Sequence, residues 1–201
     1  MKDLLRIAHY SFGIANAWDE QDQIQRLLHQ TFVLEIGQDA DSGTGCLLDK
    51  FHDKNTYFVA AHGNHVCGVV ALHDQPPFSA TSDLECKEQI ERLVPEIVEA
   101  RRFAISRSHR SGIIFAGLTW VIHQHAMQQG YRYVLISGIL KRRRMYERMG
   151  FSAVGRIVRK GAADFMPMLL DLSALPEQIC LDLDRWKRRV LPFAGVPCPK
   201  L

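Results

Sequence analysis

The chain has 201 residues, of which 47% are hydrophobic and 23% are charged, so its composition is too apolar for a disordered protein. This length predicts one domain with a sizeable core. The 25 Lys and Arg residues nearly balance the 22 Asp and Glu residues, and the resulting net charge of +3 excludes a chain that binds polyanions over its whole surface.

Targeting and redox features of the sequence favour the cytoplasm. No apolar run is long enough to cross a membrane, and Asp3 and Arg6 interrupt the segment in which a signal peptide needs an apolar core. The five cysteines are widely spaced and form no C-x-x-C pair, which indicates neither a disulfide framework nor a zinc site. We therefore expect a cytoplasmic protein without a metal or a membrane partner.

The first predicted element is an amphipathic helix over residues 19–32, with Asp19 as its N-cap. The apolar residues that recur at helical spacing are Ile24, Leu27, Leu28 and Phe32. The glycine-rich stretch 37–45 follows and is predicted to be a surface loop. Asp39 and Asp41 in this stretch lack the ligand spacing and the closing Glu of a calcium-binding loop.

A hairpin and a second helix are predicted next. The β-rich runs 56–61 and 66–72 are joined by the short turn His62-Gly63-Asn64-His65, which predicts an antiparallel pair. A helical pattern over residues 84–94 then ends at Pro95.

The second half of the chain predicts a strand, a helix and a strand in succession. Residues 97–105 read as a strand, 106–112 as a polar turn, and 113–129 as a strong helix that Gly130 closes. Residues 131–137 read as a buried strand. Together these elements predict a βαβ unit.

The last predicted elements are a short basic helix over residues 141–149, a strand over 165–172 and a helix after Pro176. We expect residues 1–175 to form one α/β domain, and residues 176–201 to form a C-terminal helix and tail packed on it.

The turn inside the βαβ unit carries phosphate-binding chemistry. A helix N-terminus presents unpaired N–H groups and a partial positive charge. Gly112 lets an anion approach the backbone, and Arg107, Arg110 and Ser111 supply further donors. The turn therefore suits a pyrophosphate, while an ordinary polar turn with one glycine stays open as the alternative.

Three stretches together resemble a GNAT-family acyl-CoA N-acyltransferase, and the similarity covers residues 56–172. They are the strand 99–105, the turn that leads into the following helix, and the Tyr-x-x-x-Gly-Phe element at 146–151. The Glu-x-x-Arg-Phe sequence at 99–103 also resembles the acyl-homoserine-lactone synthases and the N-acyl amino acid synthases, which are branches of the same fold. The resemblance implies an α/β fold with a mixed, mostly antiparallel sheet flanked by helices.

Two residues of the turn depart from the family pattern. His109 stands where Arg or Gln is usual, and Ile114 stands where a second Gly or Ala is usual. The departures leave two donors open, acetyl-CoA or another acyl-CoA on one side and an acyl carrier protein on the other, because both carry a pantetheine arm.

The resemblance also implies how the thioester is held. The two central strands, which end near Ile105 and Ser137, are expected to separate and to pair their backbone with the pantetheine arm. The residues that the resemblance implies for cofactor binding are Phe103, Ala104, Ile105, Arg107, His109, Arg110, Ser111, Gly112, Ile113 and Ile114.

The same resemblance implies a direct transfer with no covalent acyl-enzyme. Glu99 is the candidate general base for the protonated amine, and Tyr146 is the candidate general acid for the leaving thiolate. Arg102 would orient Glu99 or receive a carboxylate of the acceptor, while Ser137 and Phe165 would line the substrate site.

Three functions stay open on the sequence. The first is an N-acyltransferase that moves an acyl group, with acetyl expected, from acyl-CoA to a primary amine. The second is a long-chain N-acyl amino acid or homoserine-lactone-type synthase that uses acyl carrier protein, and the third is a non-catalytic acyl-CoA sensor. We expect a small-molecule amine substrate and no nucleic acid, although the basic run 141–144 also suits an acidic carrier protein, and a homodimer stays open.

Overall fold

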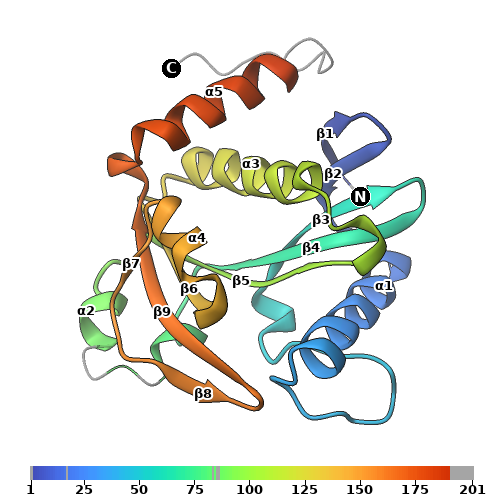
Figure 1. The fold of residues 1–201 in the computed structure, drawn as a ribbon, viewed down its shortest axis with the longest axis horizontal. Coiled ribbons are helices and arrows are strands. Elements are labelled where there is room, and N and C mark those ends of the chain that lie inside the picture. The colour runs from blue at the N-terminus through green and yellow to red at the C-terminus, as the bar shows by residue number, and fades with distance from the viewer. Residues whose placement is uncertain (1, 17, 83, 85–86, 191–201) are drawn as a thin grey trace.

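Nine strands form one sheet with helices on both of its faces in the computed structural model of the chain (Figure 1). The structure describes residues 2–16, 18–82, 84 and 87–190. The strands are β1 (Lys2–Ile7), β2 (Tyr10–Ile14), β3 (Thr56–His62), β4 (His65–His73), β5 (Ile97–Ile105), β6 (Tyr133–Ile139), β7 (Ser152–Ala153), β8 (Val158–Lys160) and β9 (Ala163–Asp171).

The α-helices are α1 (Trp18–Leu28), α2 (Lys87–Glu91), α3 (Gly112–Gln129), α4 (Arg143–Arg148) and α5 (Glu177–Val190). A π-helix, η1 (His29–Glu35), continues α1. Short 3-10 turns are η2 (His52–Lys54), η3 (Ser79–Thr81), η4 (Arg107–His109), η5 (Leu140–Arg142) and η6 (Leu172–Ala174). Within the described residues, no helix is both long enough and apolar enough to cross a membrane.

The strand order is β1-β2-β3-β4-β5-β6-β9-β7, and β8 also pairs with β9. Only β5 and β6 run parallel among the described pairs, which confirms the predicted βαβ unit and the mostly antiparallel sheet. Their ladder covers residues 97–99 of β5 and residues 133–135 of β6. Beyond that point the two strands separate, as the resemblance implied.

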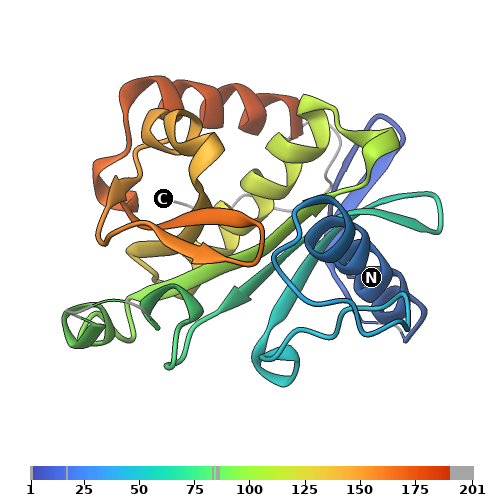
Figure 2. The same ribbon diagram turned by 60° about the horizontal axis from the view of Figure 1, so that its bottom comes forward.

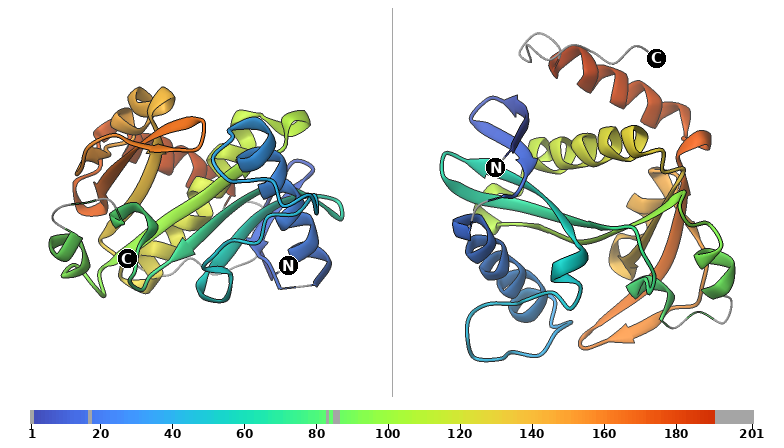
Figure 3. Two further views of the ribbon diagram at one scale, coloured as in Figure 1. Left: turned by 90° about the horizontal axis from the view of Figure 1, so that it is seen from below. Right: turned by 180° about the vertical axis from the view of Figure 1, so that it is seen from behind.

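Two apolar layers cover the sheet, one on each face. Helix α3 packs on one face against a core that includes Phe12, Phe58 and Leu118. Helix α1 packs on the other face, and Phe32 of η1 extends that core. Figures 2 and 3 show α1 and α3 on opposite sides of the strands, with α5 beyond α3. The opening between β5 and β6 therefore lies in a sheet that carries a different helix layer on each face.

The N-terminal hairpin of β1 and β2 is absent from the sequence expectations. Its strands are short, and their apolar side chains do not predict a hairpin locally, because they pack against residues far along the chain. Phe12, for example, is fully buried against α3, where its ring takes the space that a methyl group added to Gly117 would need. Tertiary packing on α3 thus stabilises a pair of strands with weak local signals.

The first predicted helix differs from the observed one at both ends. It begins at Trp18, so Asp19 lies in the first turn and is not the N-cap. After Leu28 the chain widens into η1, where the N–H of Ile36 donates to the carbonyl of Thr31 at 3.0 Å. A π-helix is rare and often accompanies a functional site.

Several other boundaries also shift. The helix expected over 84–94 is confined within the described residues to α2, and the one expected over 141–149 divides into η5 and α4. Strand β6 begins at Tyr133, the first residue of its ladder with β5, and the N–H groups of Arg132 and Tyr133 both donate to the carbonyl of Glu96. The C-terminal helix is present as α5, while the tail and two of the five cysteines, Cys86 and Cys198, lie outside the described residues.

Candidate active site

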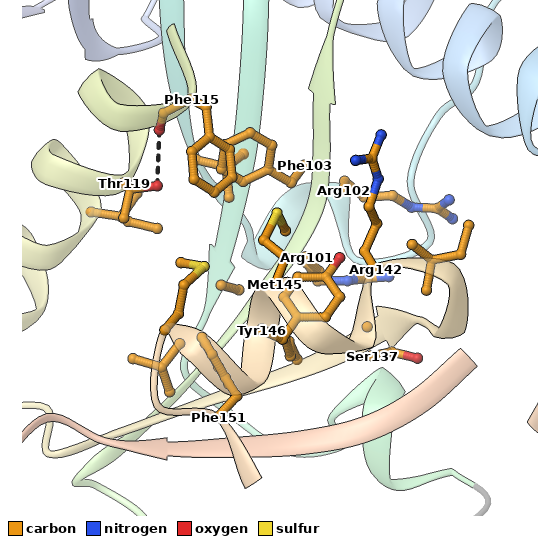
Figure 4. Close-up of a pocket in the computed structure, with 18 of the residues that line it drawn as sticks. Arg101, Arg102, Phe103, Phe115, Thr119, Ser137, Arg142, Met145, Tyr146 and Phe151 are labelled. Carbon is orange, nitrogen blue, oxygen red and sulfur yellow. Dashed lines mark hydrogen bonds between the residues drawn. The ribbon is translucent and has the colours of Figure 1, made fainter. Parts of the chain in front are cut away.

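A cavity of about 620 Å³ occupies the opening between β5 and β6. It is lined from α3, from both separated strands, from α4 and from η1, so it reaches both faces of the sheet. Figure 4 shows Phe103, Phe115, Met145 and Tyr146 around the same space, with Arg101 and Arg102 also at the cavity. The cavity is therefore one passage with an apolar half and a polar half.

The apolar half follows α3 along its length. The Phe115 ring is tilted against the Phe103 ring, with 5.4 Å between ring centroids. Further apolar lining comes from Ile122, Ala126, Val134, Met145, Met149, Phe151, Phe165, Leu170, Leu172, Leu175 and Leu183. From Gly112 to Ala126 the helix rises about 21 Å, so this wall is long enough for an extended chain. Such a surface takes a flexible hydrocarbon.

The polar half lies toward η1 and is built on a buried ionic cluster. Asp49, whose carboxylate is fully buried, accepts from Arg101 Nη1 at 2.7 Å and from Arg102 Nε at 2.7 Å. Arg102 also donates to both carboxylate oxygens of Asp39, and its guanidinium lies 4.9 Å from the Phe32 ring. Burial alone would raise the pKa of Asp49, but the two guanidinium groups hold it below its ordinary value.

Strand β5 bulges where this cluster forms. Arg102 has a φ of 54°, which is unusual for a residue with a side chain, and the register against β4 shifts between Val69 and Ala71. The ion pairs of Arg102 with Asp39 and Asp49 hold this strained backbone in place. The bulge leaves Arg102 and Phe103 without partners in the β4 ladder, beside the cavity.

Glu99 lies at the base of the strand opening but does not line the cavity. It is completely buried, and its carboxylate accepts from Ser79 N at 2.9 Å, Ser79 Oγ at 2.7 Å and Ala80 N at 2.7 Å. Ser79 itself lines the cavity. Ser79 therefore links the buried carboxylate of Glu99 to the cavity wall. Nothing in the local sequence around Glu99 indicates this contact, since Ser79 lies twenty residues earlier.

Tyr146 lines the cavity from α4. Burial raises the pKa of its phenol above the ordinary value, and a hydrogen bond from the backbone of Ile139 opposes part of that shift. Because the pKa stays raised, the hydroxyl keeps its proton at neutral pH. Its ring packs so closely on β6 that a methyl group added to Gly138 would lie 2.8 Å from the ring. A protonated hydroxyl in this place suits a proton donor.

The turn before α3 presents an open backbone at Gly112, where an added methyl group would meet no heavy atom within 4 Å. Arg110, Ser111 and Gly112 line the cavity. The side chains of Arg107 and Arg110 both pair with Glu35 of η1. Partial burial would raise the pKa of Glu35, but hydrogen bonds from the two arginines lower it. The arginines therefore already have an anionic partner within the chain.

The structure brings most of the expected site residues together. Those that line the one cavity are Arg102, Phe103, Ala104, Ile105, Arg110, Ser111, Gly112, Ser137, Tyr146 and Phe165. The others expected there are Glu99, Arg107, His109, Ile113 and Ile114, and they do not line it. Ile114 is fully buried in the core against Gly68, and His109 is held by the hydroxyls of Ser106 and Ser108, each at 2.9 Å. Local side-chain packing, which spacing does not reveal, takes these two away from the site.

Sequence reasoning missed Thr31, Asp49 and Ser79. Thr31 lay within a helical pattern, and Ser79 and Asp49 contact Glu99 and Arg101, which are distant from them in the chain. No group of three or more potential metal ligands occurs among the residues that the structure describes.

A family model described as the N-acyl amino acid synthase FeeM matches residues 23–171. No curated protein matches the chain in a sequence search. Among solved structures, the AHL synthase LasI has a TM-score of 0.70 and 16% identity, over 97% of this chain and 100% of its own. FeeM from uncultured soil microbes has a TM-score of 0.66 and 18% identity, over 91% and 96% of the two chains.

The CoA-dependent acyl-homoserine lactone synthase BjaI has a TM-score of 0.65 and 22% identity, over 84% of this chain and 82% of its own. At these identities the likeness concerns the fold alone. It confirms the acyltransferase fold that the motifs of β5, the following turn and α4 predicted.

Proposed function

The chain belongs to the FeeM family of N-acyl amino acid synthases and is an acyltransferase, and from that premise we propose that it joins a medium- or long-chain acyl group to the amino group of an amino acid. The apolar half of the cavity carries the proposal. Its walls extend along α3 from Gly112 to Ala126, about 21 Å, which an acetyl group would leave largely empty. Acetyl transfer, expected at first, is therefore the less suitable reaction.

The thioester donor would enter by the turn before α3. The open backbone at Gly112 and the N-terminus of α3 suit the pyrophosphate of acyl-CoA. The pantetheine arm would lie along residues 103–105, whose edge faces the cavity and has no partner strand in β6. The acyl chain would then continue between α3, α4 and β9. An acyl carrier protein presents the same arm, so the experiment below compares both donors.

The amine becomes a nucleophile when it loses a proton. In the proposed scheme its proton passes to Ser79 Oγ while the Ser79 proton passes to Glu99, 2.7 Å away. The amine nitrogen then forms a bond to the thioester carbonyl carbon, and the backbone of the β5 bulge is available to stabilise the oxyanion. The C–S bond breaks, and Tyr146 gives its proton to the leaving thiolate. The nitrogen, which after the attack carries two hydrogens and a positive charge, gives one proton to the tyrosinate of Tyr146, and the neutral amide results. Glu99 later returns its proton through Ser79 to solvent.

The experiment is a thiol-release assay with acyl-CoA and acyl carrier protein of several chain lengths, each offered to the twenty amino acids. We expect octanoyl or longer thioesters to be consumed with formation of N-acyl amino acid. Glu99→Gln and Tyr146→Phe should each lower kcat by about 100-fold, the usual contribution of one acid–base group, with little change in KM for the thioester. Thioester binding without transfer to any amine would instead make the chain a sensor and refute the proposal.

A further inference from the structure

The turn before α3 carries two arginines whose side chains are accessible. Arg110 lines the cavity and its side chain is 48% exposed, and the side chain of Arg107 is 68% exposed. The Nε of Arg110 donates to the carbonyl of Ile105 at 3.2 Å, which holds this guanidinium where β5 ends and the turn begins. The cation therefore lies at the junction between the strand edge proposed for the pantetheine arm and the turn that leads to the open backbone at Gly112.

Glu35, the last residue of the π-helix η1, pairs with both arginines. Its side chain is 11% exposed, its Oε1 lies 2.9 Å from Arg107 Nε, and its Oε2 accepts a hydrogen bond from Arg110 Nη2. Glu35 thus cancels half of the positive charge that the two arginines bring to the turn. The first turn of α3 itself carries no acid, and Ser111 makes no side-chain cap, so this negative charge comes to the turn from a separate segment.

An anion that binds at the N-terminus of α3 must share these arginines with Glu35. A diphosphate at this turn would accept hydrogen bonds from backbone N–H groups near Gly112 and from the guanidinium groups. Glu35 already holds both guanidinium groups, and a second anion brought beside its carboxylate is repelled. The repulsion increases with the charge of the donor. It is therefore strong for acyl-CoA, whose nucleotide carries a diphosphate and a further phosphate, and absent for a pantetheine thioester, which has no phosphate.

We propose that Glu35 is a specificity-determining residue for the thioester donor, because it competes with the donor phosphates for Arg107 and Arg110 and so weakens the binding of a nucleotide thioester. The inference rests on the proposed function, which assigns the donor to this turn. The protein would thus discriminate among thioesters by their phosphates at the turn, and by their acyl chains in the apolar half of the cavity. If the three side chains only tied η1 to the turn, removing the charge of Glu35 would leave the affinity for the donor unchanged.

The test compares octanoyl-CoA with octanoyl-pantetheine, which has the same acyl chain and arm but no phosphate, in the wild type and in Glu35→Gln. Glutamine keeps the length of the side chain and removes its charge. In Glu35→Gln, KM for octanoyl-CoA should fall about tenfold, because the phosphates gain charge-assisted hydrogen bonds without an internal competitor, while KM for octanoyl-pantetheine stays unchanged. The gain for octanoyl-CoA should become smaller as the salt concentration rises, because salt screens exposed charges.

Two further variants separate charge competition from packing. Asp22→Asn removes a carboxylate from another arginine pair, the exposed one with Arg26 on α1, and should leave both KM values unchanged. Adding Arg110→Gln to Glu35→Gln should abolish the gain for octanoyl-CoA, because the guanidinium that the first substitution released is then lost. An unchanged KM for octanoyl-CoA in Glu35→Gln, or an equal fall for both thioesters, would overturn the inference.

Calorimetric titration of CoA into the same proteins gives a measurement that needs no turnover. The Kd for CoA should fall by the same factor in Glu35→Gln, and an unchanged Kd would overturn the role of Glu35 while leaving acyl transfer intact. A lower Kd in Glu35→Gln without transfer to any amino acid, in the variant or in the wild type, would support the role of Glu35 in donor binding and refute the proposed function.

Discussion

An Ala126→Phe substitution should shorten the acyl chain that the protein accepts. Ala126 lines the cavity from α3, is 2% exposed, and lies about 21 Å from Gly112 along the helix axis. A phenyl ring at this end would take the space of the last methylene groups of a long chain. If about three methylene groups lose their burial at about 0.8 kcal/mol each, the loss is about 2.4 kcal/mol, or roughly 50-fold in kcat/KM.

The assay is thiol release with acetyl, octanoyl and dodecanoyl thioesters. We expect the 50-fold loss with dodecanoyl and almost none with acetyl. Met127→Phe is the matched control, because Met127 is the next residue on α3 but is 55% exposed, and it should behave like the wild type. Overpacking at position 126 would also lower the free energy of unfolding by about 1–3 kcal/mol, but that effect is the same for every thioester. An equal loss for all three chain lengths, or the same selectivity in the control, would refute the assignment of the apolar half to the acyl chain.

Two other predictions concern the donor end and the ionic cluster. The Gly112→Val variant should fold normally, because the space beside Gly112 is open. It should nevertheless raise the Kd for CoA at least about tenfold in calorimetric titration, because the valine side chain blocks the N-terminus of α3. An unchanged Kd would place the nucleotide elsewhere. Asp49→Asn should lower the free energy of unfolding in urea by about 3–5 kcal/mol at neutral pH, because Arg101 and Arg102 lose a buried counter-charge. Since the pKa of Asp49 is lowered in the folded state, its contribution is complete above about pH 4 and disappears as the pH falls through the lowered pKa. The difference in the free energy of unfolding between wild type and Asp49→Asn should therefore become smaller in acid, and a difference that does not change with pH would contradict this account.

The sequence predicted the central part of the fold because that part depends on local patterns. Strand β5 has the predicted bounds, and α3 ends at Gly130, which adopts the left-handed conformation of a helix C-cap. A continuous apolar strand, a glycine-closed helix and a second apolar strand leave few alternatives to a βαβ unit. The motifs on this unit, together with the Tyr-x-x-x-Gly-Phe element at 146–151, also indicated the family.

The functional site could be predicted only in part, since its polar contacts join distant segments. Arg102 was a candidate from its motif, but its partners Asp39 and Asp49 come from a loop more than fifty residues earlier. Arg107 and Arg110 were expected to hold phosphate, and the fold instead pairs both with Glu35. Charge alone does not show which of several acids an arginine will meet.

Periodicity, capping and motif spacing are properties of neighbouring residues, so they were enough to predict the order of the central elements and to indicate the family. The folded contacts were needed to show that β5 and β6 separate after three paired residues and that the Glu99 carboxylate accepts from the Ser79 hydroxyl. Burial and hydrogen-bond partners depend on which surfaces the folded chain brings together, and packing across the whole sheet decides these contacts.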